Sequence, residues 1–303
     1  FQTLKQGDHV IIGRNVYGGT YRMAVDVLSR HGFEFEFVDT RFIKKIENAL
    51  RPNTKWIFVE TPTNPLLELC DITLIAKLCK NNDVKLAVDN TFMSPYGQNP
   101  LKLGADIVMH SATKFIGGHS DLIAGVLITN DTVFAEELYF IQKSGGAISS
   151  PFDCWLLLRS TKTMALRVQK QSDNAMLISK VLQAHSKAYS VIYPGLENHA
   201  QHKLAIRQQI NPEGLPIFGC MVSFKCESIE KRDSFLSKLK LFTLAESLGG
   251  VESLICVPYE MTHASVPKKI KKDMDLVPEL VRLSVGIEHI DDLSNDIIEA
   301  LED

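Results

Sequence analysis

One lysine follows the end of an apolar run and is surrounded by small and hydroxyl-bearing residues, in the stretch HSATKFIGGHSD at 110–121. Ser111, Thr113 and a Gly-Gly pair are its neighbours. An ordinary lysine has a pKa of about 10.4 and is protonated near neutral pH, so it is a poor nucleophile. Burial at the end of a strand lowers that pKa and frees the amine to form an imine with a carbonyl group. Lys114 is therefore a candidate for covalent chemistry.

A carboxylate stands at the corresponding place one apolar run earlier. Asp89 ends the run KLAVD at 85–89. A buried carboxylate is unfavourable unless it is paired, and a protonated pyridine nitrogen would pair with it and keep the ring an electron sink. Ser111 and Thr113 add hydroxyl groups suited to a phosphate. Taken alone, each residue also fits a turn cap or a solvated side chain. Together with Lys114 they describe a pyridoxal phosphate site.

Other catalytic motifs are missing from the sequence. It has no GxxxxGK[ST], no GxGxxG after the first expected strand, no GxSxG and no HExxH. His110 and His119 lack the spacing of a zinc pair, so we expect no metal. SATK at 111–114 fits the lysine motif of β-lactamases, but that class also needs a KTG motif, which does not occur.

Composition restricts the partners and the compartment. The 303 residues include 33 Lys and Arg against 36 Asp and Glu, a net charge of −3, so no global field favours nucleic acid or an anionic membrane. Six cysteines without a CxxC pair suit reduced thiols. No apolar window approaches the length of a membrane span. We therefore expect a cytoplasmic protein that binds a small molecule.

The elements that would position these residues alternate in type through the first half of the chain. Strands are expected at His9–Ile12, Phe33–Val38, Trp56–Glu60, Lys85–Asp89, Ile107–Met109 and Ile123–Thr129, and amphipathic helices at Thr20–His31, Arg41–Leu50 and Asp71–Asn81. This alternation predicts a mainly parallel α/β sheet. Such sheets bind ligands at the carboxyl ends of their strands, where Glu60, Asp89 and Ser111 lie. Residues 1–5 have the pattern of a helix end.

The second half has a different pattern. A long helical region is expected at Asp153–Ala184, with an interruption near 160–161. Strands are then expected at Tyr189–Tyr193, Cys220–Phe224 and Val281–Val285, and helices at Ile229–Lys240 and Asp291–Leu301. We predict a cofactor-binding α/β domain over residues 1–160. A connecting helix and an α+β C-terminal domain are predicted over 161–303.

Several longer motifs carry a resemblance to a known family. They are YGGT at 17–20, ETPTNP at 60–65, VDNTF at 88–92, HSATKFIGGHSD at 110–121, LAESLGGVESLI at 244–255, MTHASVP at 261–267 and VRLSVGIEH at 281–289. In this order they resemble the Cys/Met-metabolism family of pyridoxal phosphate-dependent enzymes. The resemblance covers essentially the whole chain. It implies the aspartate-aminotransferase-like fold, fold type I, with pyridoxal 5'-phosphate as the cofactor.

The resemblance also implies roles for single residues at the cofactor. Lys114 would bind it covalently, and Asp89 would pair with its ring nitrogen. Tyr17 would stack on the ring and take part in catalysis, as an aromatic face suits a flat heterocycle. Ser111 and Thr113 would bind the phosphate.

Further residues are implied on the substrate side. Asn64 would lie near the ring's 3-hydroxyl oxygen and the substrate. Arg282 and Ser247 would take the substrate's α-carboxylate, a role that suits the planar fork of an arginine. Arg282 also alternates with apolar residues, so the outward side of a strand is the less favoured alternative for it. Glu246 would tune specificity or cap a turn.

Within the family, the resemblance is nearest to the cystathionine γ-lyases. It implies a carbon–sulfur lyase that performs γ-elimination on cystathionine in transsulfuration. Methionine γ-lyases usually have a cysteine where Gly18 stands, and β-lyases usually have a tryptophan near Leu248. The alternatives are a cystathionine γ-synthase, which performs γ-replacement on an activated homoserine, and a catalytically silent fragment that retains the fold.

The resemblance finally implies a homotetramer, a dimer of dimers. Chains of the family have a segment that adds phosphate contacts and helps the tetramer assemble. No such segment precedes Phe1 in this sequence. We therefore expect cofactor binding and assembly to be weakened if the protein lacks it.

Overall fold

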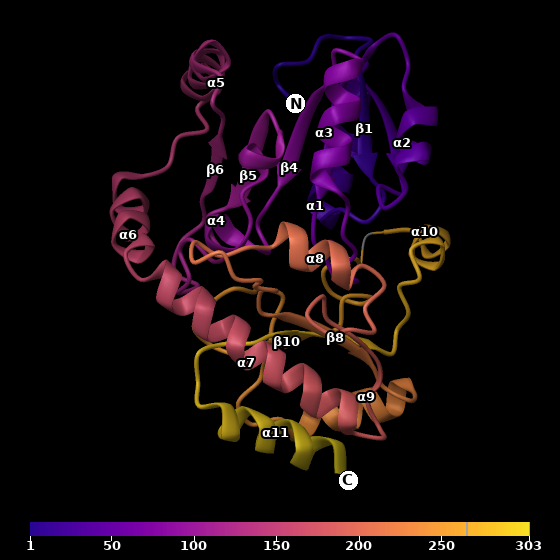
Figure 1. Cartoon of the computed structure of the whole chain (residues 1–303), viewed down its shortest axis with the longest axis vertical. Coiled ribbons are helices and arrows are strands. Elements are labelled where there is room, and N and C mark those ends of the chain that lie inside the picture. The colour runs from indigo at the N-terminus through magenta and orange to yellow at the C-terminus, as the bar shows by residue number, and fades with distance from the viewer. Residues whose placement is uncertain (265, 303) are drawn as a thin grey trace.

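Six strands from the first half of the chain form one sheet in the order β2-β1-β3-β4-β5-β6 (Figure 1). The computed structural model describes residues 1–264 and 266–302. The strands are β1 (His9–Gly13), β2 (Glu34–Val38), β3 (Thr54–Glu60), β4 (Lys85–Asp89), β5 (Ile107–Ser111) and β6 (Gly125–Ile128). All neighbours pair in parallel except β6, which is antiparallel to β5. The predicted mainly parallel sheet is confirmed.

The central strands of this sheet are buried on both faces, as is typical of parallel sheets, whereas the edge strand β6 is largely exposed. In β1, Ile11 packs into one apolar cluster, whereas Val10 and Ile12 pack into another on the opposite face. Helices α2 (Ile43–Ala49) and α3 (Ile72–Asn81) cover the face of Ile11.

Two expectations for the first half are wrong. The helix expected over residues 20–31 is three short pieces: α1 (Gly18–Arg22), a π-helical turn (Met23–Val27) and a 3-10 turn (Leu28–His31). Residues 1–5 form turns and no helix. Helix α5 (Thr132–Gly145), the short α4 (Ser94–Gly97) and a 3-10 turn (Pro100–Leu103) were not expected.

The long helical region is divided as the sequence predicts. Helix α6 (Pro151–Thr161) ends just before α7 (Met164–Ala184) begins. The hydroxyl of Ser150 caps α6 by accepting the Asp153 N–H, and Pro151 takes the first helical position, where a missing N–H has no consequence. Figure 1 shows α7 running from the first sheet to the second, along the whole C-terminal layer.

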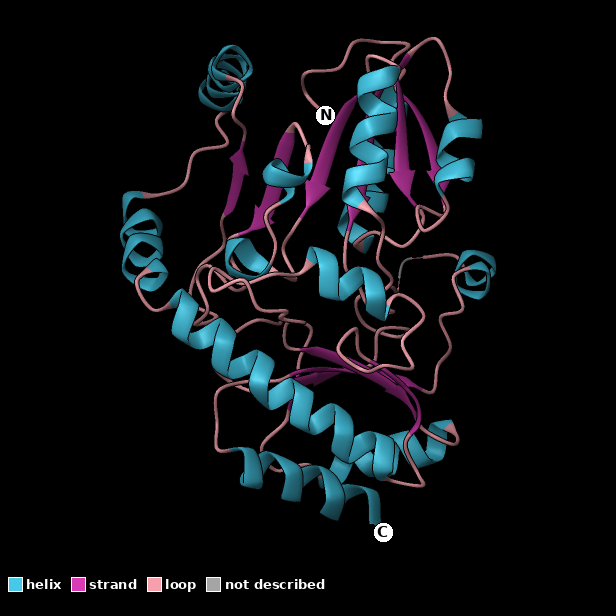
Figure 2. Ribbon diagram, in the orientation of Figure 1, coloured by secondary structure: helices cyan, strands magenta, loops and turns pink. Residues whose placement is uncertain are grey.

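The second sheet has the order β7-β8-β11-β10-β9. Its strands are β7 (Tyr189–Ile192), β8 (Met221–Lys225), β9 (Thr243–Leu244), β10 (Leu254–Cys256) and β11 (Leu280–Ser284). The other helices of this half are α8 (His202–Gln208), α9 (Ile229–Lys238), α10 (Lys268–Asp273) and α11 (Ile290–Glu302). Helices α9 and α11 and the C-terminal part of α7 lie on the side of this sheet away from the first sheet (Figure 2).

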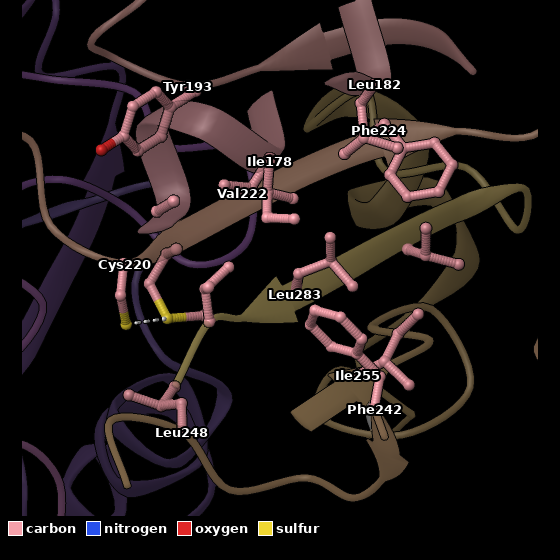
Figure 3. Packing of buried hydrophobic residues seen from close by; sticks show 14 of the residues in the cluster. Ile178, Leu182, Tyr193, Cys220, Val222, Phe224, Phe242, Leu248, Ile255 and Leu283 are labelled. Atoms are coloured by element: carbon pink, nitrogen blue, oxygen red, sulfur yellow. Dashed lines mark hydrogen bonds between the residues drawn. The ribbon is translucent and has the colours of Figure 1, made fainter. Parts of the chain in front are cut away.

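The core of this half forms between helix and sheet. Ile178 and Leu182 of α7 pack with Val222, Phe224 and Leu283 of the sheet (Figure 3). The predicted α+β organisation of these residues matches the structure, whereas the division of the chain at residue 160 stays a prediction. Ser265, within the motif at 261–267, and Asp303, the end of the second predicted domain, lie outside the described residues. No helix in the described ranges is long and apolar enough to cross a membrane.

Candidate active site

Three neighbouring parallel strands end with polar side chains on the side that faces the second sheet. Glu60 ends β3, Asp89 ends β4 and Ser111 ends β5, and Glu60 is paired with Asp89 in the strand register. Figure 2 shows the arrowheads of these strands pointing toward the C-terminal layer. Arg282 comes from that layer, in β11. The sequence-predicted residues therefore meet between the two sheets.

Lys114 lies in the turn that follows β5. Its Nζ donates to the Ser247 Oγ at 3.3 Å, across 133 residues of sequence. Burial lowers the pKa of Lys114, the nearby positive charge of Arg282 lowers it further, and Glu246 opposes the shift. A lower pKa makes the neutral, nucleophilic amine more available.

The turn after Lys114 is held by a buried guanidinium. Arg167 of α7 donates to the carbonyl oxygens of Phe115 at 2.9 Å and Ile116 at 3.3 Å. Gly118 has a φ of +70°, and a Cβ there would collide with the Arg167 guanidinium. Arg167 forms no ion pair within the described residues, so its charge is balanced by backbone carbonyl dipoles.

Asp89 is held by a threonine that the sequence analysis missed. The Thr91 N–H and hydroxyl both donate to the Asp89 Oδ1, at 3.0 and 2.6 Å. The Thr91 Oγ1 also accepts the N–H of Ser111 at 2.9 Å, which joins the ends of β4 and β5. The position of Thr91, two residues after a strand-end aspartate, is a signal for such a turn.

No cation in the described part of the chain forms an ion pair with Asp89. The side chain is 5% exposed, and burial raises its pKa to about 6, although the Thr91 hydrogen bonds act in the opposite direction. Glu60 lies beside it, and burial together with the charge of Asp89 raises the pKa of Glu60 well above its usual range. Two adjacent buried carboxyl groups favour a cationic ligand at this place.

Glu60 connects the segments that carry Tyr17 and Asn64. Its Oε2 accepts the Tyr17 N–H at 2.8 Å, and its Oε1 accepts the Asn64 N–H at 2.9 Å. The Tyr17 side chain is 49% exposed at the beginning of α1. The ring lies over Gly19, where a Cβ would meet it, and a Cβ on Gly18 would come within 2.9 Å of the Thr262 carbonyl oxygen.

Arg282 is buried and has only neutral partners. It is 1% exposed, which rules out the outward strand position that its alternation also allowed. Nη1 donates to the Asn64 Oδ1 at 2.8 Å, and Nη2 donates to the carbonyl oxygens of Glu246 at 3.0 Å and Ser247 at 3.3 Å. Its buried Nε has no partner in the described residues. A charged fork in this state is suited to an incoming carboxylate.

The remaining predicted residues lie on the same turns. The Thr113 hydroxyl donates to the Ala124 carbonyl oxygen at 3.3 Å and accepts the Ala124 N–H at 3.0 Å, so it already stabilises the turn. Ser111 is half-buried and Glu246 is exposed. Leu248 is buried in the C-terminal core (Figure 3), so this position packs the fold.

These residues fit pyridoxal phosphate. The observation that tests the fit is the pair of adjacent buried carboxyl groups, Asp89 and Glu60. Neither forms an ion pair within the part of the chain that the structure describes, and a protonated ring nitrogen would supply a cation there. Lys114 offers an amine with a lowered pKa for covalent attachment, and Tyr17 offers an exposed ring. Within the described residues, no group of acidic, histidine and cysteine side chains could hold a metal ion.

A mainly parallel sheet with a lysine and an aspartate at its strand ends defines a pyridoxal phosphate-dependent enzyme of fold type I. The sequence profile of the Cys/Met metabolism PLP-dependent enzymes matches residues 1–302. The chain belongs to this family, and its cofactor is pyridoxal phosphate.

Relatives within the family have different reaction names. The chain is 50% identical to a cystathionine γ-lyase of Bacillus subtilis, over 98% of this chain and 76% of the relative. It is 46% identical both to a cystathionine β-lyase of Lactococcus lactis, with coverages of 98% and 76%, and to a cystathionine γ-synthase of Mycobacterium tuberculosis, with 98% and 75%.

A solved structure agrees with the fold. The crystal structure of cystathionine γ-lyase from Lactobacillus plantarum complexed with L-serine has a TM-score of 0.95 and 43% identity, over 99% of this chain and 77% of that one. The family and fold predicted from the sequence are confirmed.

Proposed function

We propose that the protein is a carbon–sulfur lyase that converts cystathionine and water into cysteine, 2-oxobutanoate and ammonia. The observation that supports an amino acid as the substrate is the buried Arg282 guanidinium. It donates to neutral acceptors only and lies near the Lys114 amine. The choice of γ-elimination is supported by the 50% identity to a cystathionine γ-lyase.

Each residue has a distinct task in this proposal. When bound, pyridoxal phosphate supplies an electron sink for negative charge at the substrate Cα. Lys114 would hold the cofactor covalently, and its amine, once the substrate amine has replaced it on the cofactor, would accept the proton from Cα. Asp89 keeps the ring nitrogen protonated, and Tyr17 packs against the ring. Ser111 and Thr113 face the phosphate.

The substrate side would be formed by a different set. Arg282 takes the α-carboxylate in two hydrogen bonds and thereby fixes the direction of the Cα–H bond, with Ser247 and Asn64 beside it. The exposed carboxylate of Glu246 is available for the ammonium group at the distal end of cystathionine.

The products decide between the reactions. Purified protein with pyridoxal phosphate is given cystathionine, and 2-oxobutanoate and pyruvate are measured separately. The proposal requires cysteine and 2-oxobutanoate, whereas homocysteine with pyruvate would identify a β-lyase. The second candidate is a γ-synthase, favoured by the 46% identity to the mycobacterial γ-synthase. A γ-synthase would form cystathionine from an activated homoserine and cysteine faster than it degrades cystathionine.

We also propose that the protein is a cytoplasmic homotetramer whose cofactor-binding domain ends near residue 160. Large apolar side chains on α6 are exposed, with Phe152 at 66%, Trp155 at 57% and Leu158 at 70%, and they support burial between subunits. Sedimentation velocity at micromolar concentration tests the assembly, and a monomer would contradict it.

A further inference from the structure

One strand-end carboxyl group has no role in the proposed reaction. Glu60 is 6% exposed, and the Tyr17 and Asn64 N–H groups each occupy one of its oxygens. Tyr17 precedes it by 43 residues, so Glu60 ties a distant segment to its own loop. The side chain is thus placed between the residue that faces the cofactor and the residue that contacts Arg282.

The contacts of Glu60 continue to both ends of the site. On one side it fixes the backbone at Tyr17, whose ring position follows from that backbone. On the other side it fixes Asn64, whose Oδ1 accepts from the Arg282 Nη1 at 2.8 Å. A shift at either N–H would therefore move the aromatic ring or the guanidinium.

We infer that Glu60 is a positioning residue that sets the ring of Tyr17 and the guanidinium of Arg282 at a fixed separation. A carboxylate has two acceptor oxygens, whereas an amide has one and turns an N–H₂ group toward the other N–H. Glu60→Gln can therefore hold only one of the two segments. The inference relies on the proposed function for the roles of Tyr17 and Arg282, and its contacts are independent of the reaction.

Asp296 provides a matched control. It is also 6% exposed and accepts backbone N–H groups at both oxygens, from Lys240 at 2.8 Å and from Leu241 at 2.9 Å. It lies in α11, in the C-terminal layer, and its hydrogen-bond partners among the described residues, Lys240, Leu241 and Phe242, do not belong to the site. Asp296→Asn therefore reproduces the loss of a buried, backbone-bound carboxylate without the proposed positioning.

The experiment compares Glu60→Gln with Asp296→Asn in the cofactor-loaded protein. Both variants are expected to melt at a lower temperature than the unchanged protein. Only Glu60→Gln should alter the visible circular dichroism of the bound cofactor. It should also raise the Kd for pyridoxal phosphate and the KM for substrate, each about tenfold or more, as for a lost hydrogen bond to a charged group.

Unchanged circular dichroism, cofactor affinity and KM in Glu60→Gln, with only a lower melting temperature, would make Glu60 merely structural. If Glu60→Gln does not fold, Glu60→Asp is measured instead, since its shorter side chain cannot reach both N–H groups. The same changes in circular dichroism, cofactor affinity and KM are expected, and their absence would again contradict the inference. Failure of the proposed reaction is recognised separately, by absent 2-oxobutanoate in the unchanged protein. The cofactor affinity and circular dichroism still test Glu60 in that case.

Discussion

Replacing Asp89 with asparagine should change the pH dependence of folding by an amount that follows from its burial. Burial raises the pKa of Asp89 from 3.8 to about 6 in the folded protein. The native state therefore holds this proton more tightly than the unfolded chain. For that reason Asp89 makes the free energy of unfolding fall as pH rises from about 4 to about 6. A shift of about two units corresponds to about 3 kcal/mol.

The measurement is urea unfolding of the cofactor-free chain between pH 4 and pH 7. His110 and His199 also titrate in this range: burial lowers the pKa of each to about 4, which makes stability rise with pH. Both are present in the unchanged protein and in Asp89→Asn, so they cancel from the difference between the two curves. The difference reports Asp89 together with Glu60, because the charge of Asp89 also raises the pKa of Glu60, and the two contributions have the same sign. The free energy of unfolding of Asp89→Asn minus that of the unchanged protein should increase by about 3 kcal/mol as the pH rises from 4 to 7.

The cofactor should reverse this advantage. Bound pyridoxal phosphate brings a cationic ring nitrogen to the carboxylate, so it should stabilise the unchanged protein more than Asp89→Asn. The variant should keep some bound cofactor while its kcat falls severely, because an amide does not hold the ring nitrogen protonated. Parallel unfolding curves across the pH range, or an unchanged kcat, would refute the assignment of Asp89.

Three further variants test the rest of the site. Lys114→Ala should remove the visible absorption of covalently bound cofactor and essentially all elimination; full turnover would reject its role. Arg282→Ala should raise KM for every amino-acid substrate about ten- to a hundredfold, from a lost contact of about 1.5–3 kcal/mol, and lower kcat without changing the cofactor spectrum. Loss of both cofactor absorbance and melting temperature would instead make Arg282 a residue of the fold. Thr91→Val removes the hydroxyl hydrogen bond that lowers the pKa of Asp89 and keeps the one from the backbone N–H, so the stability change assigned to Asp89 should extend to higher pH; an unchanged pH range would contradict it.

The strands and the location of the site could be predicted because both depend on local sequence. Apolar runs such as 85–89 specify buried strands, and parallel strands bring their carboxyl ends to one edge, so Asp89 and Ser111 had to lie close together. The position of Arg282 was ambiguous, because alternation along a strand does not say what covers its second face. Here both faces of β11 are buried.

Other parts depend on contacts that the sequence does not encode locally. Arg167 lies 52 residues from Phe115, and nothing in its own helix indicates which carbonyl groups it meets. Helix α5 escaped prediction since Val133, Tyr139 and Phe140 are exposed and form no single buried stripe. The helix expected over residues 20–31 fails because a periodic pattern does not determine whether the backbone keeps α-helical hydrogen bonds.

The two sheets contribute different parts of the chemistry. The groups proposed for the cofactor, Lys114 and Asp89, lie at the strand ends of the first sheet and in the turn after β5, and the guanidinium proposed for the substrate comes from β11 of the second. Hydrogen bonds that join the two layers at the site include those from Lys114 to Ser247 and from Arg282 to Asn64. Substitutions on the turn that carries Ser247 can therefore change which amino acid is held without altering the groups that hold the cofactor. We expect this separation to underlie the different names, γ-lyase, β-lyase and γ-synthase, of relatives with similar identity to this chain.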